Sequence, residues 1–198
     1  MKLKELINGL EVLEWHADPE LEISGVSYDS RKTENGDMFV AISGYASDGH
    51  DYINAAAEKG AACILCEKKP ELDIPFVLVS DTRRGLAGAG AHYFGDPARK
   101  MKIIGVTGTN GKTTTTNLIK SILEQLCDDK VGLIGTNCNM IGDKIVDTER
   151  TTPESFDLQK LLRQMGDEGC KYVVTEVSSH ALYLKRVYGI EFEVGVFF

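Results

Sequence analysis

The stretch MKIIGVTGTNGKTTTTNLI, residues 101–119, joins an apolar run to a glycine-bracketed turn, a lysine and a row of threonines. The apolar run predicts a strand, and a helix over residues 112–126 is predicted to follow, with Leu118, Ile122 and Leu126 on one face. The N–H groups in the first turn of such a helix have no partner within it and can bind an anion. The stretch therefore predicts a strand, an anion-binding loop and a helix in an α/β fold.

The residue types in this loop suit a nucleoside triphosphate. Glycine lets the backbone approach a phosphate, Lys112 would contact the β- and γ-phosphates, and the Thr113 hydroxyl would bind magnesium. The pattern G-x-x-x-x-G-K-[ST] is not strictly met, because Val106 stands at its first glycine, so an incidental lysine in a glycine-rich turn is the alternative. No asparagine is followed by lysine, as in the guanine-specific sequence N-K-x-D, which favours ATP over GTP. The predicted nucleotide-binding residues are Gly108, Thr109, Asn110, Gly111, Lys112, Thr113 and Thr114.

A magnesium site also needs a carboxylate, and two acidic residues are candidates. Glu176 ends the apolar stretch KYVVTE, whereas Asp147 lies among charged residues in a segment that suggests an exposed hairpin. Ligand sites lie at the carboxyl ends of strands in such sheets, so we predict Glu176, together with Thr113, as the magnesium ligands. A surface carboxylate at a strand end is the alternative for Glu176. Lys112 and Glu176 are the predicted catalytic residues.

Composition limits the remaining possibilities. The chain has 198 residues, 42% of them hydrophobic and 26% charged, which is typical of globular proteins. A formal net charge of -8 argues against a nucleic-acid partner. No segment reaches the ~20 apolar residues of a membrane span, and MKLKELINGLEVLEW predicts a short amphipathic helix instead of a signal peptide. These features, with five scattered cysteines, predict a cytoplasmic location and no membrane partner. Cys63 and Cys66 fall in a predicted strand, where they would be buried thiols on opposite faces.

Strands alternate with helices along the whole chain, which predicts two α/β domains. The first, residues 1–98, would have a mixed sheet, and the second, residues 99–198, would be the first part of a mostly parallel, P-loop-type sheet. The stretch GDPARK, residues 95–100, is the predicted linker. The apolar run VGVFF at residues 194–198 predicts a buried strand, and from it we expect the sequence to be a piece of a longer protein.

At GTNGKTT the chain resembles the Mur ligase family, the ATP-dependent amide-forming enzymes of peptidoglycan precursor synthesis. Residues 28–61 are similar to the UDP-sugar-binding domain of the members that add the third residue and the final dipeptide of the peptide. RTTPES at 150–155 and EVSSHALYLKR at 176–186 resemble the branch that adds the third residue to UDP-N-acetylmuramoyl-L-alanyl-D-glutamate. The resemblance implies that residues 1–98 bind the UDP-muramoyl substrate and that residues 99–198 belong to an incomplete ATP-binding domain.

The resemblance also implies a reaction and its substrates. ATP would phosphorylate the substrate carboxylate, and the amine of a diamino acid, meso-diaminopimelate or L-lysine, would attack the acyl phosphate. Such chemistry needs positioning and charge neutralisation more than a protein nucleophile. We expect a monomer. The resemblance implies that a modified lysine and an amino-acid-binding domain lie beyond Phe198. The 198 residues alone are therefore expected not to turn over.

The substrate-binding residues are carried over from the resemblance. They are Tyr28, Ser30 and Tyr45 for the uridine end, and Thr151, Thr152, Ser178 and Arg186 for the diphosphate and muramoyl parts. The alternatives are a helix N-cap for the threonine pair, a surface turn for Ser30 and a solvated helix charge for Arg186. His180 is assigned either a role near the site or a hydrogen-bonded structural role. Two other functions stay open: a non-catalytic paralogue that binds a UDP-sugar or nucleotide, and an unrelated P-loop ATPase or kinase.

Overall fold

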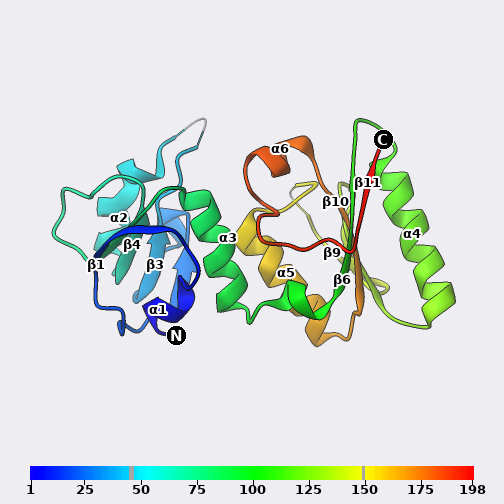
Figure 1. Cartoon of the computed structure of the whole chain (residues 1–198), viewed down its shortest axis with the longest axis horizontal. Helices are drawn as coiled ribbons and strands as arrows, with labels where there is room; N and C mark the ends of the chain where they lie inside the picture. The colour runs from blue at the N-terminus through cyan, green and yellow to red at the C-terminus, as the bar shows by residue number, and fades with distance from the viewer. Residues whose placement is uncertain (45–46, 149) are drawn as a thin grey trace. The chain divides into compact units, whose positions relative to one another are not determined.

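The computed structural model describes residues 1–44, 47–148 and 150–198. They form two compact units, Met1–Tyr93 and Phe94–Phe198, each built around one sheet (Figure 1). The structure divides the chain slightly before the linker that the sequence predicts, because Pro97–Lys100 forms a 3-10 helix, η3, that packs against helix α5 of the second unit. Within the described residues, no helix combines the length and the apolar character that a membrane crossing requires.

The first unit has a five-stranded mixed sheet in the order β1-β5-β4-β3-β2. Strands β2 to β5 run parallel, and β1 pairs antiparallel with β5. Its elements are α1 (Leu3–Leu6), β1 (Val12–His16), β2 (Gly25–Ser27), η1 (Ser30–Lys32), β3 (Asp37–Val40), η2 (Gly49–Tyr52), α2 (Ile53–Glu58), β4 (Cys63–Cys66), β5 (Phe76–Val79) and α3 (Thr82–Tyr93). The predicted mixed α/β architecture is confirmed.

The predicted amphipathic helix at the N-terminus is wrong after its first turn. Helix α1 ends at Leu6, Gly9 adopts a φ of +75°, and Val12–His16 forms strand β1. An alternation of charged and apolar residues fits the twofold period of a strand as well as a helical turn. Antiparallel pairing with β5 decides in favour of the strand, and such a long-range contact cannot be read from the local pattern.

The thiols of the first unit are buried, as the sequence predicts. Cys63 and Cys66 lie in β4 with no exposed surface, and burial raises the pKa of both thiols to about 12. Cys170, in the second unit, is also buried, and burial raises the pKa of its thiol. Cys127 and Cys138 are partly exposed. Only an accessible thiolate reacts readily with disulfide reagents, so burial and the raised pKa protect Cys63, Cys66 and Cys170.

We therefore expect Ellman's reagent to titrate two thiols in the folded protein and all five cysteines after unfolding in guanidinium. Replacing both Cys127 and Cys138 by serine should abolish the reaction of the folded protein. Rapid reaction of Cys63 or Cys66 in the native state, identified by mass spectrometry, would contradict the burial of β4.

The second unit has a six-stranded sheet in the order β11-β6-β10-β7-β8-β9. Strands β11, β6, β10 and β7 are parallel, whereas β8 and β9 form an antiparallel hairpin at one edge. Its remaining elements are β6 (Lys102–Thr107), α4 (Lys112–Cys127), β7 (Val131–Ile134), β8 (Asn139–Ile141), β9 (Lys144–Val146), α5 (Ser155–Asp167), β10 (Tyr172–Glu176), α6 (Ser179–Tyr183) and β11 (Val194–Phe197). The predicted mostly parallel sheet is confirmed.

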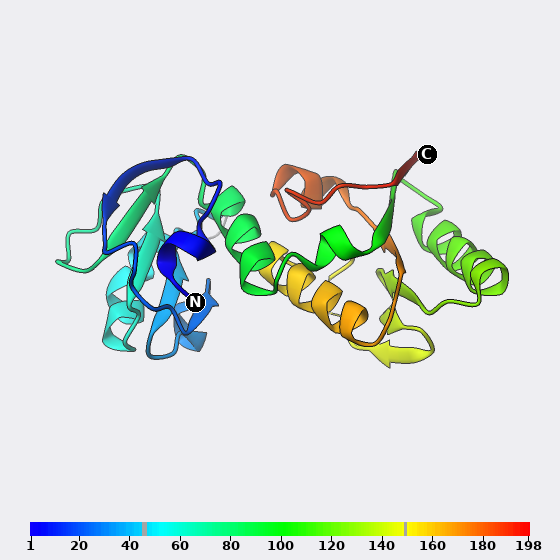
Figure 2. The same cartoon turned by 60° about the horizontal axis from the view of Figure 1, so that its bottom comes forward.

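Helices cover both faces of this second sheet (Figures 1 and 2). On one face, Ile119 and Leu123 of α4 pack with the buried side chains of β6, β7 and β10. On the other face, Leu158 and Leu162 of α5 pack with buried residues that include Val173 of β10. The strands therefore end in fixed positions, and the loops at their carboxyl ends are held by a packed core.

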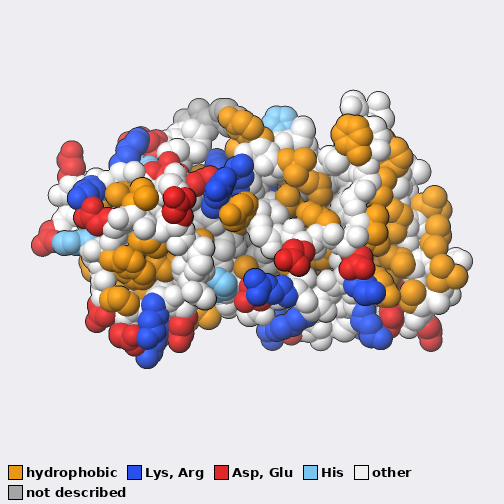
Figure 3. All heavy atoms as spheres, viewed as in Figure 1, with side chains coloured by type: hydrophobic (Ala, Val, Ile, Leu, Met, Phe, Trp, Pro, Cys, Tyr) orange, Lys and Arg blue, Asp and Glu red, His pale blue; other side chains and the backbone are white. Residues whose placement is uncertain are grey.

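The predicted burial of VGVFF is wrong, and an apolar stripe on α4 is also exposed. The stripe of Leu118, Ile122 and Leu126 on α4 is 58%, 45% and 77% exposed, because the neighbouring positions of the helix face the sheet. Strand β11 forms as predicted, but it lies at an edge with β6 as its neighbour, and Phe197 is 82% exposed. Apolar side chains accordingly follow the surface of α4 in Figure 3.

Candidate functional site

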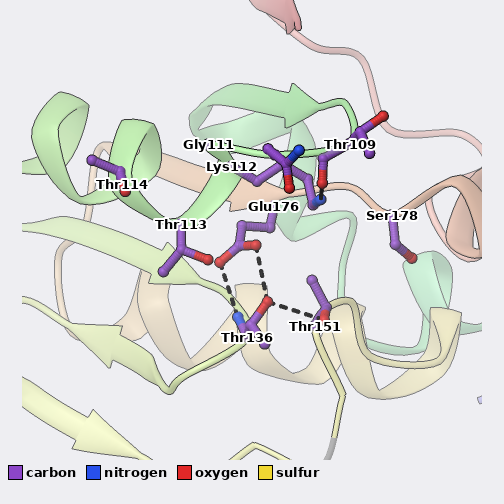
Figure 4. Close-up of a pocket in the computed structure, with 10 residues that line it drawn as sticks. Thr109, Gly111, Lys112, Thr113, Thr114, Thr136, Thr151, Glu176 and Ser178 are labelled. Carbon is purple, nitrogen blue, oxygen red and sulfur yellow. Dashed lines mark hydrogen bonds between the residues drawn. The ribbon is translucent and has the colours of Figure 1, made fainter.

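A pocket of about 410 Å³ lies at the carboxyl ends of β6, β7 and β10 (Figure 4). This volume is in the range of small-molecule sites. The pocket is lined by Thr109, Asn110, Gly111, Lys112, Thr113, Thr114, Thr136, Thr151, Glu176 and Ser178. The structure thus brings together the predicted nucleotide loop, the predicted magnesium carboxylate and two of the predicted substrate residues.

The backbone of the loop is arranged to bind an anion. Gly108 and Gly111 adopt φ angles of +140° and +82°, and Gly111 is the N-cap of α4. Thr115 makes the first helical hydrogen bond, to the carbonyl of Gly111 at 2.9 Å. Within the described residues, the N–H groups of residues 109–114 donate to no backbone or side-chain acceptor. They are therefore available to phosphate oxygens, reinforced by the positive end of the helix dipole.

Gly108 also has a steric role in the loop. A Cβ at this position would lie 2.7 Å from the carbonyl oxygen of Phe198, which follows β11. Around Gly111, by contrast, a Cβ would meet nothing within 4 Å. The loop is therefore closed on the side of Gly108 and open at Gly111, where a ligand can approach the backbone.

The Lys112 ammonium lies over this loop. Its Nζ donates to the carbonyl oxygen of Gly108 at 2.8 Å and to that of Thr109 at 3.4 Å. Both partners are neutral, and Lys112 forms no ion pair within the described part of the chain. The positive charge is thus placed at the loop without being neutralised, which suits a lysine that binds phosphate.

The Glu176 side chain is buried at the floor of the pocket, with the residue 1% exposed. Its Oε1 accepts the N–H of Thr136 at 3.0 Å, and its Oε2 accepts the Thr136 hydroxyl at 2.9 Å. Among the described residues no cation pairs with this carboxylate. A buried carboxylate without a counter-charge is costly, and a bound cation would offset that cost.

The donor set around Glu176 fits magnesium. Figure 4 shows Thr113 directed towards the Glu176 carboxylate from the first turn of α4. One carboxylate and a hydroxyl are oxygen ligands of the kind that magnesium uses beside phosphate oxygens and water. The described residues contain no group of three His, Cys, Asp or Glu side chains that could hold a metal by themselves. Asp147 is exposed and outside the pocket lining, so the geometry favours Glu176 over Asp147.

The segment before α5 is tied to the end of β10 by buried contacts. Thr152 is 1% exposed, donates its hydroxyl to the carbonyl of Glu176 at 2.9 Å and accepts the N–H of Ser178 at 3.2 Å. The threonine pair does not cap α5, whose N-cap is Glu154. Thr151 and Ser178 line the pocket, whereas Thr152 holds the backbone behind it. Their contacts with substrate stay predictions.

Arg186 lies in a buried ion pair and is not a solvated helix charge. Its Nε contacts Oε2 of Glu154 at 3.2 Å, and its Nη1 donates to the carbonyl of Thr152 at 3.1 Å. The side chains of Arg186 and Glu154 are 13% and 9% exposed. Arg186 therefore fixes the segment that carries the threonine pair. His180 is exposed, outside the pocket lining, and its ring makes no hydrogen bond with the described residues.

The predicted uridine-contacting residues belong to the first unit. Ser30 begins η1 and is 9% exposed, and Tyr28 is partly buried. Between them, Asp29 accepts the N–H of Arg31 at 3.0 Å and makes a two-point contact with the Arg31 guanidinium. The turn is therefore closed by side-chain as well as backbone contacts. Tyr45 lies outside the described residues, so the uridine-binding roles stay predictions.

The Asp29–Arg31 contact predicts a small pH effect on stability. Hydrogen bonding by Arg31 lowers the pKa of Asp29 to about 2. The usual pKa of an aspartate in an unfolded chain is ~4. The contact therefore stabilises the fold fully above pH ~4, and this stabilisation is lost as the pH falls towards 2. Because Arg31 is 86% exposed, Asp29→Asn should lower the free energy of unfolding by less than ~1 kcal/mol at neutral pH. Urea unfolding over a pH series measures this, and a difference that grows below pH ~4 would contradict it.

Sequence reasoning did not identify Thr136, Gly135 or Glu154. The sequence KVGLIGT did contain a signal for Gly135 and Thr136, because these two residues follow an apolar strand. The carboxyl ends of parallel strands meet at one edge of the sheet, so residues at such an end can reach the same site. Strand β7, which carries this sequence, lies directly beside β10 in the sheet. Glu154 gave no local signal, because its partner Arg186 is remote in the sequence.

Comparison with known proteins agrees with this geometry. Residues 22–107 match the Mur ligase family catalytic domain, and residues 106–198 match the Mur ligase middle domain. A curated relative from Clostridium tetani, UDP-N-acetylmuramoyl-L-alanyl-D-glutamate–2,6-diaminopimelate ligase, is 50% identical over all of this chain and 41% of its own length. The chain thus spans about two fifths of that relative.

Solved structures give the same result. The structure of a UDP-N-acetylmuramoyl-L-alanyl-D-glutamate–2,6-diaminopimelate ligase is similar over 100% of this chain and 40% of its own, with a TM-score of 0.81 and 27% identity. A MurF ligase from Thermotoga maritima, solved in complex with ADP, is similar over 81% of this chain and 33% of its own, with a TM-score of 0.53 and 25% identity. The chain belongs to the Mur ligase family.

Proposed function

We propose that this chain forms the substrate- and ATP-binding part of a ligase that adds a diamino acid to UDP-N-acetylmuramoyl-L-alanyl-D-glutamate. The observation that carries this proposal is the pocket in which the free amides of residues 109–114 and the Lys112 ammonium lie beside the buried Glu176 carboxylate. Amides and an ammonium suit a polyphosphate, and an unpaired carboxylate suits the magnesium ion that accompanies it.

Each group in the pocket has a proposed role. The loop amides and Lys112 bind the triphosphate of ATP, and Thr113 and Glu176 would hold magnesium. When bound, magnesium would neutralise charge on the phosphates. Thr151 and Ser178 present hydroxyls on the same pocket, where they would contact the acidic substrate, while Thr152 and Arg186 hold that segment in place. Tyr28, Ser30 and Tyr45 of the first domain would bind the uridine end.

The proposed reaction is two successive displacements. An oxygen of the substrate carboxylate attacks the γ-phosphorus of ATP, so that ADP leaves and an acyl phosphate forms. The amine nitrogen of the diamino acid then attacks the carbonyl carbon, phosphate leaves with its bridging oxygen, and the amine loses a proton as the amide forms. In both steps the protein acts by holding the reacting groups together and by neutralising charge.

The names of the relatives favour one diamino acid. The Clostridium tetani relative is named for 2,6-diaminopimelate, and we propose meso-diaminopimelate in preference to L-lysine. We also propose that the protein acts as a monomer in the cytoplasm, where ATP is available, with small molecules as its partners and neither nucleic acid nor membrane among them.

Isothermal titration calorimetry of the 198-residue chain tests this proposal. We expect ATP to bind, to bind more tightly with magnesium chloride present, and to bind in preference to GTP. UDP-N-acetylmuramoyl-L-alanyl-D-glutamate should bind separately, and Ser30→Ala should weaken it. Absence of ATP binding with and without magnesium would refute the nucleotide site. ATP binding without any affinity for the UDP-linked substrate would contradict the proposed substrate, and the reverse would favour a non-catalytic paralogue.

A further inference from the structure

The Glu176 carboxylate rests against a short backbone segment after β7. A Cβ at Gly135 would lie 2.6 Å from Oε1 of Glu176, so a side chain there would displace the carboxylate. The next residue, Thr136, donates its N–H to Oε1 and its hydroxyl to Oε2, at 3.0 and 2.9 Å. One residue therefore contacts both carboxylate oxygens, which fixes the plane and direction of the group. We call Gly135 and Thr136 the carboxylate cradle.

The cradle is itself anchored in the sheet. The N–H of Gly135 donates to the side-chain oxygen of Asn139 at 3.3 Å, and Asn139, in β8, is 4% exposed. The main chain of Glu176 is held independently, because its carbonyl accepts the buried hydroxyl of Thr152. The Glu176 carbonyl thus accepts the hydroxyls of Thr152 and Thr175, and its carboxylate is held by Thr136 from a different segment of the chain.

The hydroxyl of Thr136 connects the carboxylate to the proposed substrate segment. The Oγ atoms of Thr136 and Thr151 lie 3.1 Å apart (Figure 4). Thr136 has one hydroxyl proton, and the ionised carboxylate is the stronger acceptor. When Thr136 donates to Glu176, the proton between the two hydroxyls must come from Thr151. A single row of hydrogen bonds then runs from Thr151 through Thr136 to Glu176.

The cradle also separates two opposite charges in one pocket. Lys112 and Glu176 both line it, yet the Lys112 ammonium contacts loop carbonyls and the Glu176 carboxylate contacts Thr136. An ionised carboxylate has about four lone-pair positions, and Thr136 occupies two of them. Those that remain can serve a cation. An ion pair between the two side chains would neutralise the charge that the triphosphate needs. With the carboxylate held by Thr136, the described residues show no such pair.

We propose that Thr136 is a positioning residue that holds the Glu176 carboxylate ready for magnesium and links it to Thr151. The proposal rests on the proposed function, because it assigns the support of the magnesium ligand in that same site. Groups that orient a metal ligand in this way typically change metal affinity by 10- to 100-fold when they are removed.

The test is calorimetric titration of ATP with and without magnesium chloride into the wild-type chain, Thr136→Val and Thr136→Ser. The quantity compared is the ratio of the two dissociation constants, which reports the contribution of the metal. We expect this ratio to fall about tenfold in Thr136→Val, which keeps the shape of the side chain but lacks the hydroxyl. In Thr136→Ser, which keeps the hydroxyl, the ratio should stay within about threefold of wild type. Affinity for ATP without magnesium should change little in either variant.

Asn137→Ala is the matched control, since Asn137 is an exposed neighbour in the same turn and outside the pocket lining. The positioning role of Thr136 would be overturned if folded Thr136→Val kept the wild-type ratio of dissociation constants, or if Asn137→Ala lowered that ratio equally. Either result would leave the proposed metal site itself standing. Absence of a magnesium effect in wild type would overturn the proposed metal site and the cradle with it. Should Thr136→Val fail to fold, as judged by circular dichroism, Thr136→Ala carries the same expectation.

Discussion

Replacing Lys112 by alanine should weaken ATP binding by roughly 30- to 150-fold. The estimate corresponds to about 2–3 kcal/mol, the usual contribution of a hydrogen bond to a charged group. In the structure the Lys112 ammonium contacts neutral carbonyls of the loop, so it can turn to the phosphates without breaking an ion pair. The free energy of unfolding should change little, because two neutral partners at the surface of the loop remain accessible to water. Calorimetric titration with ATP and magnesium measures the first quantity, and urea unfolding measures the second.

Lys144→Ala is the control for nonspecific charge effects, since Lys144 is an exposed lysine of β9 outside the pocket lining. It removes the same charge from the protein and should leave ATP affinity within about twofold of wild type. Equal affinities of Lys112→Ala and wild type would show that the loop does not bind the triphosphate. An equal loss in both variants would attribute the effect to net charge instead of to the loop.

The nucleotide loop could be predicted from the sequence because its chemistry is local. Glycine, lysine and threonine follow one another between a strand and a helix, and Gly108 and Gly111 do adopt the positive φ angles that only glycine takes readily. Glu176 could be predicted because it ends an apolar strand, and parallel strands that begin together end together. The mostly parallel order of the second sheet follows from the same alternation of strands and helices.

The features that sequence reasoning missed depend on contacts between remote segments. Thr136 contacts Glu176 across 40 positions of the chain, and Arg186 contacts Glu154 across 32. No periodicity marks such pairs. The same holds for Val12–His16, which became a strand through pairing with β5. The sequence places Leu118, Ile122 and Leu126 on one face of α4, but a helix with apolar residues on more than one side does not reveal which side meets the sheet.

The buried ion pair of Arg186 predicts the largest loss of stability. Arg186→Ala should lower the free energy of unfolding by about 3 kcal/mol, since removing one partner leaves the other charge buried. Glu154 would keep a contact with Arg150 at 3.8 Å, but Arg150 is 52% exposed and gives weak compensation. The carbonyl of Thr152 would also lose its donor. Urea unfolding followed by circular dichroism measures the change.

Two variants show whether the ion pair is the cause. Arg163→Ala breaks the ion pair between Arg163 and Asp167, whose two side chains are 47% and 57% exposed, respectively. It should lower the free energy of unfolding by less than ~1 kcal/mol. Adding Glu154→Gln to Arg186→Ala also removes the carboxylate charge that faced Arg186, so the double variant should lose less stability than the sum of the two single changes. Arg186→Ala that unfolds like wild type yet no longer binds the UDP-linked substrate would contradict this expectation and would make Arg186 a direct substrate contact. The other outcome is that Arg186→Ala lowers both stability and substrate affinity while Arg163→Ala changes neither. The loss of substrate binding then follows from release of the Thr151–Thr152 segment, because Arg186 holds that segment through the Thr152 carbonyl.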